Sequence, residues 1–322
     1  MNSINHYREE FLAHVRTSVA VKEPRNLYEP IDYILQLGGK RLRPVLTLIA
    51  VDLFGGDYRK ALPAAAAVEV FHNFSLVHDD IMDNAFLRRG KATVHQKWNS
   101  NIAILSGDAM LISAYRLLES YPPDTFAALA KLFSKTALEV CEGQQWDMDF
   151  ETQTQVSIPQ YLQMIRYKTA VLVGAALQMG AIIAGASIEN QRLIYDFGVT
   201  IGLAFQLQDD YLDTFGDEDF GKKIGGDILE NKKTILYLKA LALADEAQRN
   251  TLIAQYATTE ESDEKIAIVT QLFRQTGAAE AVRYEITRTT DEALNLLEQI
   301  TISDENRAYL KQFALELMNR KV

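Results

Sequence analysis

The sequence predicts an all-α fold, a large bundle of about ten or more helices packed around a buried centre. Apolar residues recur at helical spacing, all seven prolines lie at or before Pro159, and convincing runs of alternating β-branched residues are missing. Residues 160–322 therefore contain no proline that could interrupt a helix. Near the end of the chain the helical apolar positions are Ala308, Leu310, Phe313, Ala314 and Leu317.

The individual helices follow from apolar runs and capping residues, taken in chain order. A helix is expected over 68–83, where apolar residues continue up to a charged end. The stretch SIPQ at 157–160 marks a second start, because its serine can cap the helix, its proline fits the first turn and its glutamine completes a capping box. A further helix is expected over 205–213, and the acidic stretch SDE at 303–305 marks the start of the last one.

The segment AVLVGAALQMGAIIAGASI at 170–188 has two interpretations. It is nearly long enough to cross a bilayer, and only Gln178 and Ser187 in it are distinctly polar. Its alanine and glycine content and its lack of flanking aromatic anchors favour a central helix buried by its neighbours. We therefore expect no membrane span.

Composition and charge exclude several classes of protein. The chain has 322 residues, of which 48% are hydrophobic and 24% are charged, as is ordinary for a globular protein. A net charge of −10 argues against nonspecific nucleic-acid binding, which needs a basic surface. Cys141 is the only cysteine and the N-terminal stretch lacks the apolar core of a signal peptide, so a cytoplasmic protein is expected. No linker or repeat divides the sequence, which predicts one domain over 1–322.

The stretch SLVHDDIMDNAFLRRG at 75–90 concentrates charge beside apolar residues. If 68–83 is helical, His72, Asp79 and Asp83 fall within about 40° of one another on its surface. Asp79 and Asp83 are i, i+4 neighbours, and carboxylates at this spacing repel each other unless a cation lies between them. A solvated acidic face is the alternative interpretation. Hard oxygen ligands with room for water favour Mg²⁺ or Mn²⁺ shared with substrate phosphates.

A second acidic stretch, FQLQDDYLD at 205–213, repeats this pattern among apolar residues. Its first aspartate is Asp209, about 130 residues after Asp79. Gln206 lies one helical turn before Asp209, on the same face. Chance recurrence of such a pattern in an apolar helix is improbable. We therefore expect the two helices to face each other and to hold metal ions.

Positive charge gathers at a few places although the whole chain is acidic. Arginine forks suit bidentate phosphate recognition, and lysines add point charge. Lys168, in RYKTA, also fits the simpler role of a lysine whose ammonium reaches water from a helix end. Basic clusters and two carboxylate pairs together predict two bound diphosphates, one through metal and one directly. The clustered cations are Lys40, Arg41, Arg43, Arg88, Arg89, Lys91, Lys222, Lys223, Lys232 and Lys233.

The ordered set of motifs resembles one family. GGKRLRP comes first, then His72 seven residues before DDIMD, then RRG, KTA, FQLQDDYLD and GKKIGGD. Over about Gly38 to Lys233 the sequence resembles the trans-polyprenyl diphosphate synthases, the head-to-tail prenyltransferases that include farnesyl and geranylgeranyl diphosphate synthases. This resemblance implies an isoprenoid synthase-like fold, an all-α bundle around a deep central cavity with the two aspartate motifs facing each other across its mouth.

The resemblance also implies a role for each matching residue. Asp79, Asp83 and Asp209 would coordinate three Mg²⁺ around an allylic diphosphate, with Mn²⁺ as a substitute metal. The supporting metal-site residues would be Asp80, Asp210 and Asp213. The same diphosphate would contact Arg88, Lys168 and one of Lys222 or Lys223, whose alignment stays open by one position. Isopentenyl diphosphate would bind Lys40, Arg43, His72 and Arg89, and the remaining substrate-binding residues would be Lys232 and Phe205.

The residue types suit the chemistry that this resemblance implies. Ionisation of the allylic carbon–oxygen bond creates a carbocation and a departing diphosphate, which metal and cationic groups stabilise. Lys168, Thr169 and Gln206 would act as catalytic residues that point carbonyl, hydroxyl or amide dipoles at the carbocation. The double bond of isopentenyl diphosphate then attacks, and the resemblance implies that the released diphosphate takes the proton. An apolar cavity excludes the water that would quench the carbocation.

Three residues before the first aspartate motif are expected to set product length. By helical angle, Ser75 and Phe71 lie about 40° and 80° from Asp79, whereas Phe74 lies about 140° away. The resemblance instead singles out Phe74 and Ser75, and ordinary core packing is the alternative for the two phenylalanines. One aromatic beside a small serine predicts short products of about fifteen to twenty carbons, with twenty slightly favoured.

Several alternatives stay open beside a short-chain synthase. A long-chain synthase for quinone side chains would need small residues at both length-determining positions. A terpene cyclase would not need a complete second diphosphate site, and a noncatalytic partner subunit would be expected to have lost one aspartate motif. A homodimer is expected, because family members usually pair and the apolar helices have more faces than one chain can bury.

Overall fold

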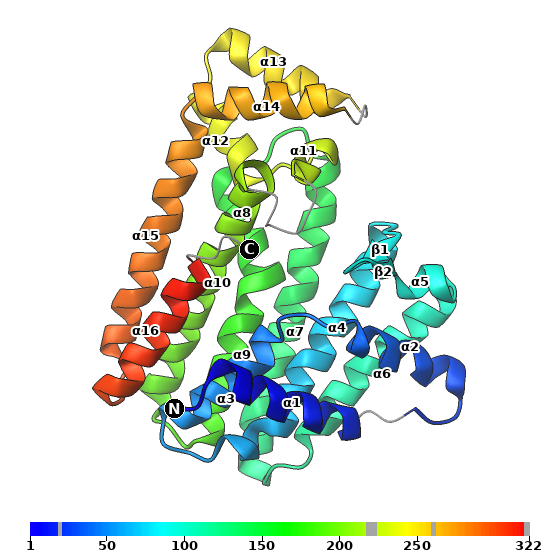
Figure 1. Ribbon diagram of the computed structural model, residues 1–322, viewed down its shortest axis with the longest axis vertical. Coiled ribbons are helices and arrows are strands. Elements are labelled where there is room, and N and C mark those ends of the chain that lie inside the picture. Colours follow the sequence, from blue (N-terminus) through cyan, green and yellow to red (C-terminus); the bar gives the residue numbers. More distant parts are fainter. Residues whose placement is uncertain (19–20, 217–223, 259–261, 319–322) are drawn as a thin grey trace. The chain divides into compact units, whose positions relative to one another are not determined.

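The computed structural model describes residues 1–18, 21–216, 224–258 and 262–318 (Figure 1). Within these ranges the regular elements are helices apart from one pair of two-residue strands, so the all-α prediction is confirmed. The chain divides into two compact units, and each is described by itself. Unit 1 comprises Met1–Lys135, Ala175–Tyr195 and Thr301–Asn306. Unit 2 comprises Thr136–Gly174, Asp196–Ile300 and Arg307–Val322.

Four long helices contribute residues to both units. They are α7 (Pro123–Thr152), α9 (Val171–Ile183), α10 (Ile188–Phe215) and α16 (Asp304–Met318). None of the helices that the structure describes is both long and apolar enough to cross a membrane. The apolar segment at 170–188 instead forms the 13-residue helix α9, which stops before Gly185, a residue with the left-handed φ of 73°. Most of its apolar side chains are buried, as the buried-helix interpretation predicts.

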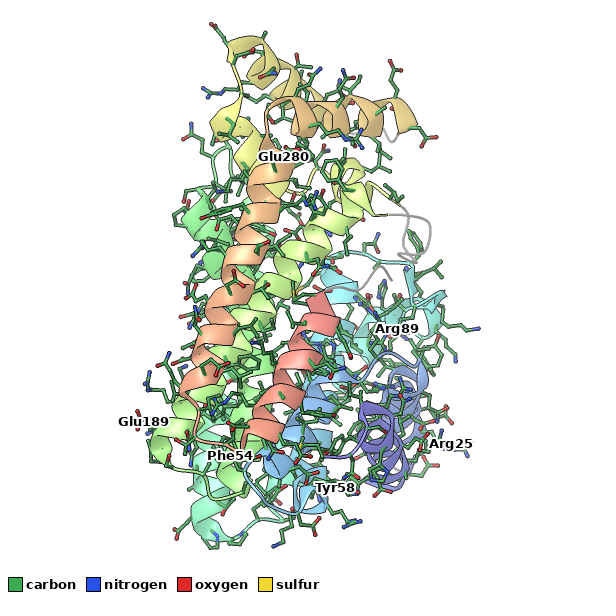
Figure 2. The ribbon with its side chains drawn as sticks, turned by 60° about the vertical axis from the view of Figure 1, so that its left-hand side comes forward. Arg25, Phe54, Tyr58, Arg89, Glu189 and Glu280 are labelled. Carbon is green, nitrogen blue, oxygen red and sulfur yellow. The ribbon has the colours of Figure 1, made fainter. Side chains whose placement is uncertain are left out.

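Unit 1 is organised around α4 and carries a short hairpin after it. The elements wholly within this unit are α1 (Ile4–Ser18), α2 (Arg25–Gln36), α3 (Leu42–Leu53), the 3₁₀ turn η1 (Tyr58–Ala61), α4 (Leu62–Met82), β1 (Leu87–Arg88), β2 (Lys91–Ala92), α5 (Val94–Lys97) and α6 (Ser100–Leu118). The four successive alanines at 64–67 of α4 are fully buried. Their small side chains let α3 and α6 pack closely against α4. Figure 2 shows Tyr58 and Arg89 at opposite ends of unit 1, before and after α4.

Unit 2 contains most of the proline-free part of the chain. The elements wholly within it are α8 (Ile158–Ile165), the π-helical turn η2 (Arg166–Ala170), α11 (Gly226–Leu229), α12 (Ile235–Leu243), α13 (Glu246–Ala257), α14 (Asp263–Gln275) and α15 (Ala278–Gln299). The predicted capping box is confirmed, since Ser157 and Gln160 exchange backbone and side-chain hydrogen bonds at the start of α8. The last helix begins at Asp304 as expected, with the Ser303 hydroxyl accepting from the Asn306 amide at 3.2 Å.

Candidate active site

The first aspartate motif lies at the carboxyl end of α4, in unit 1. The helix ends at Met82, and Asp83 follows as its C-cap, with its amide donating to the Asp79 carbonyl at 2.9 Å. The i, i+4 spacing of Asp79 and Asp83 is therefore as predicted. A helix C-terminus carries a partial negative charge, which opposes carboxylates placed there. This location strengthens the argument that the motif needs a cation.

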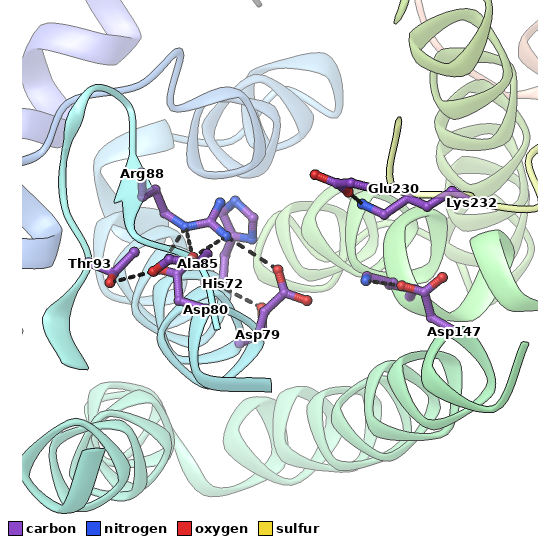
Figure 3. A network of polar contacts seen from close by, with 11 residues as sticks. His72, Asp79, Asp80, Ala85, Arg88, Thr93, Asp147, Glu230 and Lys232 are labelled. Carbon is purple, nitrogen blue, oxygen red and sulfur yellow. Dashed lines mark hydrogen bonds and ion pairs between the residues drawn. The ribbon is translucent and has the colours of Figure 1, made fainter. Parts of the chain in front are cut away.

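Arg88 supplies one such cation from the neighbouring hairpin (Figure 3). Its Nε donates to both carboxylate oxygens of Asp80 at 2.9 Å, and its Nη2 donates to Asp79 at 3.3 Å. Asp80 is only 1% exposed, and burial raises the pKa of its carboxyl while Arg88 opposes that rise. Burial alone would lower the pKa of Arg88, but the bond to Asp80 and the nearby carboxylates raise it. Arg88 thus remains charged and offsets part of the negative charge of the motif.

The hairpin that carries Arg88 and Arg89 was not predicted from the sequence. Strands β1 and β2 pair in antiparallel register, Arg88 opposite Lys91, and the turn residues Arg89 and Gly90 have positive φ of 53° and 72°. Positive φ at both central residues is the geometry of a tight hairpin turn, which RRG allows through its glycine. The Thr93 hydroxyl donates to the Ala85 carbonyl at 2.7 Å and closes the base of the hairpin (Figure 3).

A second charged group in unit 1 surrounds His72. Nη1 of Arg43 lies 3.3 Å from Nε2 of His72. Burial, followed by the charges of Arg43 and Arg89, holds the pKa of His72 well below its usual value, so the ring is neutral. Because a guanidinium can only donate, Nε2 accepts and the ring proton is on Nδ1. Arg89 also donates to the Gly38 carbonyl, which holds it against the GGKRLRP loop.

The glycines of GGKRLRP make room for these cations. Gly39 has a φ of 114°, and a Cβ at this residue would lie 2.8 Å from the guanidinium carbon of Arg89. A side chain here would therefore strain the backbone and displace Arg89. Lys40, the next residue, is exposed on the surface of unit 1. The predicted isopentenyl diphosphate residues of unit 1 thus lie on one loop, on the two helices α3 and α4, and on one hairpin.

Arg41 was grouped by sequence with the cations expected near the diphosphates, but the structure gives it a different partner. It is buried and left-handed, with a φ of 51°, and its guanidinium donates to the Glu69 carboxylate and the Leu35 carbonyl. Asn73 donates to the same carboxylate at 3.0 Å. Arg41 is therefore committed to a buried ion pair and is not presented to a phosphate. Glu69, an acid inside the apolar run of 62–71, was the sequence signal for a buried cation.

The length-determining residues differ in burial. Phe71 is fully buried, with its ring centroid 5.5 Å from that of Phe74 and 5.2 Å from that of Phe133. Phe74 keeps 8% exposure and contacts the ring of His78 at 4.8 Å. Ser75 is half-buried, and its hydroxyl donates to the His72 carbonyl at 2.8 Å. The core-packing interpretation therefore fits Phe71 best.

The second aspartate motif lies near the carboxyl end of α10, in unit 2. The Asp210 carboxylate is buried, accepts from the Tyr161 hydroxyl and accepts from Nε2 of Gln206 at 3.0 Å. Burial and the charge of Asp227 raise the pKa of the Asp210 carboxyl. Asp213 is also buried and accepts from the Asp227 amide at 3.0 Å. Neither Tyr161 nor Asp227 was assigned a role from the sequence: Tyr161 lies outside every motif, and Asp227 is the last residue of GKKIGGD but was not singled out.

Asp209 is the remaining aspartate of this motif and is half-buried, as is Phe205 one turn before it. Gly225 donates its amide to the Asp213 carbonyl at 2.6 Å, so the GGD stretch is tied to the end of α10. Within the described residues there is no group of three or more histidine, cysteine or acidic side chains close enough together to hold a metal ion. The aspartates are instead held by Arg88, Tyr161, Gln206 and backbone amides.

Lys168 lies in the π-helical turn η2 of unit 2. Its ammonium forms an ion pair with the Asp147 carboxylate at 2.5 Å (Figure 3). Gly143 of α7 packs directly against the Lys168 backbone, where a Cβ would clash with the amide nitrogen and lie 2.7 Å from Cα. Thr169 is half-buried beside it. π-Helical turns are uncommon and recur at functional sites, and the sequence did not predict this one.

The lysines that follow the second motif are placed only in part. Lys222 and Lys223 lie outside the described residues. Lys232 pairs with Glu230 at 2.7 Å (Figure 3). Lys233 donates to the carbonyls of Phe150 and Glu151 at 2.5 and 3.1 Å. Lys233 therefore tethers its own loop to the end of α7.

Comparisons with known proteins agree with these motifs. The family model for polyprenyl synthetase matches residues 24–273. The short chain isoprenyl diphosphate synthase of Methanothermobacter thermautotrophicus is 37% identical over 322 residues and covers 98% of both chains. The geranylfarnesyl diphosphate synthase of Natronomonas pharaonis is 34% identical and covers 91% of this chain and 89% of its own. A crystal structure of a geranylgeranyl pyrophosphate synthase matches with a TM-score of 0.96 and 53% identity over the whole of both chains. The chain therefore belongs to the polyprenyl synthetase family and is a prenyltransferase.

Proposed function

We propose that this prenyltransferase is a short-chain trans-prenyl diphosphate synthase that condenses isopentenyl diphosphate with an allylic diphosphate. The observation that carries the proposal is the pair of charged groups in unit 1. One is the aspartate motif at the end of α4. The other is the cluster of Arg43, His72 and Arg89, whose histidine lies on α4 less than two turns before Asp79. A neutral histidine among arginines suits an anion bound without metal. Two diphosphate sites distinguish a synthase from a terpene cyclase.

The donor set of the aspartate motifs fits Mg²⁺. All the side chains offered are carboxylates, which are hard oxygen ligands, and no thiol is among them. Asp79, Asp83 and Asp209 are proposed as ligands of three ions, with Asp80, Asp210 and Asp213 as supports, and Mn²⁺ is a possible substitute. Bound metal would neutralise the charge that develops on the departing diphosphate. Residues 1–322 are proposed to form one polyprenyl synthase domain.

The chain's own cations are proposed to complete that neutralisation. Arg88 pairs with Asp79 and Asp80, and Lys168 pairs with Asp147, so both cations are already charged and positioned. On substrate binding each can exchange a carboxylate partner for a diphosphate oxygen. One of Lys222 or Lys223 is proposed to assist them, with Lys232 and Phe205 beside the same substrate. Lys40 is proposed to join Arg43, His72 and Arg89 at isopentenyl diphosphate.

The carbocation formed by ionisation needs dipoles rather than full charges nearby. The carbonyl of Lys168, the hydroxyl of Thr169 and the amide of Gln206 are proposed to supply them. Gln206 donates its Nε2 hydrogen to Asp210, which leaves its carbonyl oxygen available to point at positive charge. The proton lost after condensation is proposed to pass to the released diphosphate.

Product length is proposed to be fifteen to twenty carbons, with twenty favoured, giving farnesyl or geranylgeranyl diphosphate. Phe74 and Ser75 are the proposed determinants, because both keep some accessible surface while Phe71 is sealed in the core. The relatives named for geranylgeranyl and geranylfarnesyl products support a short or intermediate length. A cytoplasmic location and a homodimer complete the proposal.

Product analysis tests this assignment directly. Purified enzyme is supplied with labelled isopentenyl diphosphate and, in turn, dimethylallyl, geranyl or farnesyl diphosphate, and the products are identified by mass. We expect diphosphate release to depend on isopentenyl diphosphate. Equal release in its absence, with a cyclic hydrocarbon as product, would establish a terpene cyclase instead.

A further inference from the structure

A cavity of about 250 Å³ lies among α8, η2, α10, α12 and α15 of unit 2. No residue proposed above for metal or diphosphate binding lines it. Its floor is apolar, and its opening is edged by charged side chains. The floor residues are Leu162, Leu203, Leu207 and Ile235.

Most of the charged side chains at the opening form ion pairs with one another. Glu285 accepts from Lys239 at 3.2 Å and from Arg288 at 2.9 Å, and Arg288 also lies 3.6 Å from Glu292. Partial burial alone would raise the pKa of Glu285, but the hydrogen bonds from Arg288 and Lys239 lower it, so this carboxyl is ionised. Two carboxylates and two cations thus form one connected network.

Arg166 is the exception at this opening. It lines the same cavity and is half-buried, yet among the described residues its guanidinium makes no ion pair or side-chain hydrogen bond. A guanidinium has five donors and no acceptor, which makes it a strong site for a carboxylate or phosphate. The cavity therefore has one unmatched positive charge above an apolar floor.

We infer that this cavity binds a small amphiphilic anion and regulates the enzyme. The anionic group, one carboxylate or one phosphate, pairs with Arg166, and a compact apolar group covers Leu203 and Leu207. Drug-sized ligands occupy about 300–1,000 Å³, so this cavity suits a shorter molecule, such as one with a six-carbon chain. A full diphosphate is disfavoured, because Glu285 and Glu292 would repel its additional charge.

The position of the cavity connects an occupant to the proposed diphosphate site. Arg166 opens the π-helical turn that carries Lys168, and Leu207 follows Gln206 on α10. Ile235 begins α12 shortly after Lys232. A ligand that fixes these elements changes the geometry available to Lys168, and by linkage the allylic substrate changes the affinity of the ligand equally.

Binding is tested with two saturated probes, hexanoate and hexyl phosphate, neither of which can ionise as an allylic diphosphate does. Calorimetric titration is performed without magnesium, so that metal-dependent diphosphate binding does not contribute. We expect Arg166→Gln to weaken binding at least about tenfold, the effect of losing a charge-assisted hydrogen bond. Arg283→Gln is the matched control, since Arg283 is exposed on α15 outside the cavity.

A cavity-filling variant gives a second test. Thr200→Leu adds volume to the cavity without changing charge, and should weaken both probes while Arg166 is intact. A stronger response to hexanoate identifies a fatty-acid type of ligand, and a stronger response to hexyl phosphate identifies an alkyl phosphate. No binding at millimolar probe, or equal binding by wild type and Arg166→Gln, overturns the site.

Regulation is tested separately by the rate of prenyl transfer. A saturating probe should change kcat/KM for the allylic substrate about fivefold or more in wild type and Arg283→Gln, but not in Arg166→Gln. An unchanged rate despite binding overturns the regulatory role. Only this rate measurement rests on the proposed function. The binding titration does not, so failure of one can be distinguished from failure of the other.

Discussion

Asp80, a member of the first aspartate motif that is proposed to bind metal, forms a tightly held ion pair with Arg88. Their side chains are 1% and 23% exposed, and Arg88 reaches Asp79 as well. Without such a cation, carboxylates at a helix C-terminus would destabilise the helix. Arg88 therefore offsets part of the charge of the motif before a diphosphate arrives.

At the level of single aspartates, we predict strict metal dependence. Asp79→Ala and Asp209→Ala should each lower turnover by orders of magnitude, because each removes a proposed ligand of the departing diphosphate's counter-ions. The fold should survive, since mutually repelling carboxylates contribute little stability. Steady-state turnover with Mg²⁺ and circular dichroism would measure both effects. Asp291→Ala, at an exposed position on α15, is the control, and full activity of Asp79→Ala after EDTA treatment would contradict the prediction.

The buried pair of Arg41 and Glu69 gives a stability prediction. Glu69→Gln should lower the free energy of unfolding by about 3–5 kcal/mol, because it leaves the Arg41 charge buried without its partner. Urea denaturation would measure the change. Glu29→Gln breaks an exposed pair with Arg25, and should cost less than about 1 kcal/mol. Equal effects of the two substitutions would show that Arg41 is solvated.

Three parts of the fold place the side chains that are proposed to act in catalysis. The C-terminus of α4 and the hairpin after it carry the unit 1 charges, and the π-helical turn η2 carries Lys168 and Thr169. The position of η2 depends on close backbone packing with α7, which Gly143 allows because it has no side chain to separate them.

Gly143→Ala should therefore displace the π-helical turn η2, in addition to any effect of the alanine on α7 itself. The added Cβ would meet the backbone of Lys168, which cannot rotate away, so kcat/KM for the allylic substrate should fall at least tenfold, with a stability loss of about 1–3 kcal/mol. Steady-state kinetics and urea denaturation would measure these. Gln145→Ala, on the exposed face of the same helix, is the control and should leave kcat/KM unchanged.

The position of Phe74 on α4 leads to a prediction about product length. Phe74→Ala should lengthen the product by removing a partly accessible aromatic wall, and Ser75→Phe should shorten it by adding one. Mass analysis of products from labelled isopentenyl diphosphate would detect both changes. Phe71→Leu is the comparison, because Phe71 is fully buried and should affect stability more than length. Wild-type chains of about forty carbons or more, or an unchanged distribution for Phe74→Ala, would refute the assignment.

For the whole molecule, the exposed apolar residues of α6 support a homodimer. Ile104, Leu105 and Ile112 are 44, 60 and 59% exposed on this one helix. Neighbouring apolar residues of this size on a surface are typical of an interface.

Sedimentation at micromolar concentration should therefore show a dimer. Leu105→Glu combined with Ile112→Glu should shift it to monomer, because both charges would be buried at the interface. Leu243→Glu, which alters an exposed leucine of unit 2, should not. A wild-type chain that sediments only as monomer would refute the homodimer.

The sequence by itself determined the fold class, the family and the starts of α8 and α16, whereas α4 begins at Leu62, earlier than expected. Periodicity and caps are local, so the helix over 68–83, the capping box at 157–160 and the start at 303–305 could be predicted from neighbouring residues alone. The aspartate motifs were recognisable for the same reason, because i, i+4 spacing is a property of a single helix. Their roles in metal binding stay a prediction.

Tertiary structure alone decided which partner each charged side chain contacts. Arg41 and Arg43 are two residues apart, yet one is committed to buried Glu69 and the other lies beside neutral His72. The partnerships of Asp210 with Tyr161 and of Lys168 with Asp147 join residues 49 and 21 positions apart. Such contacts depend on how helices pack, and no local spacing encodes them. The unmatched charge of Arg166 is likewise visible only where five elements enclose one cavity.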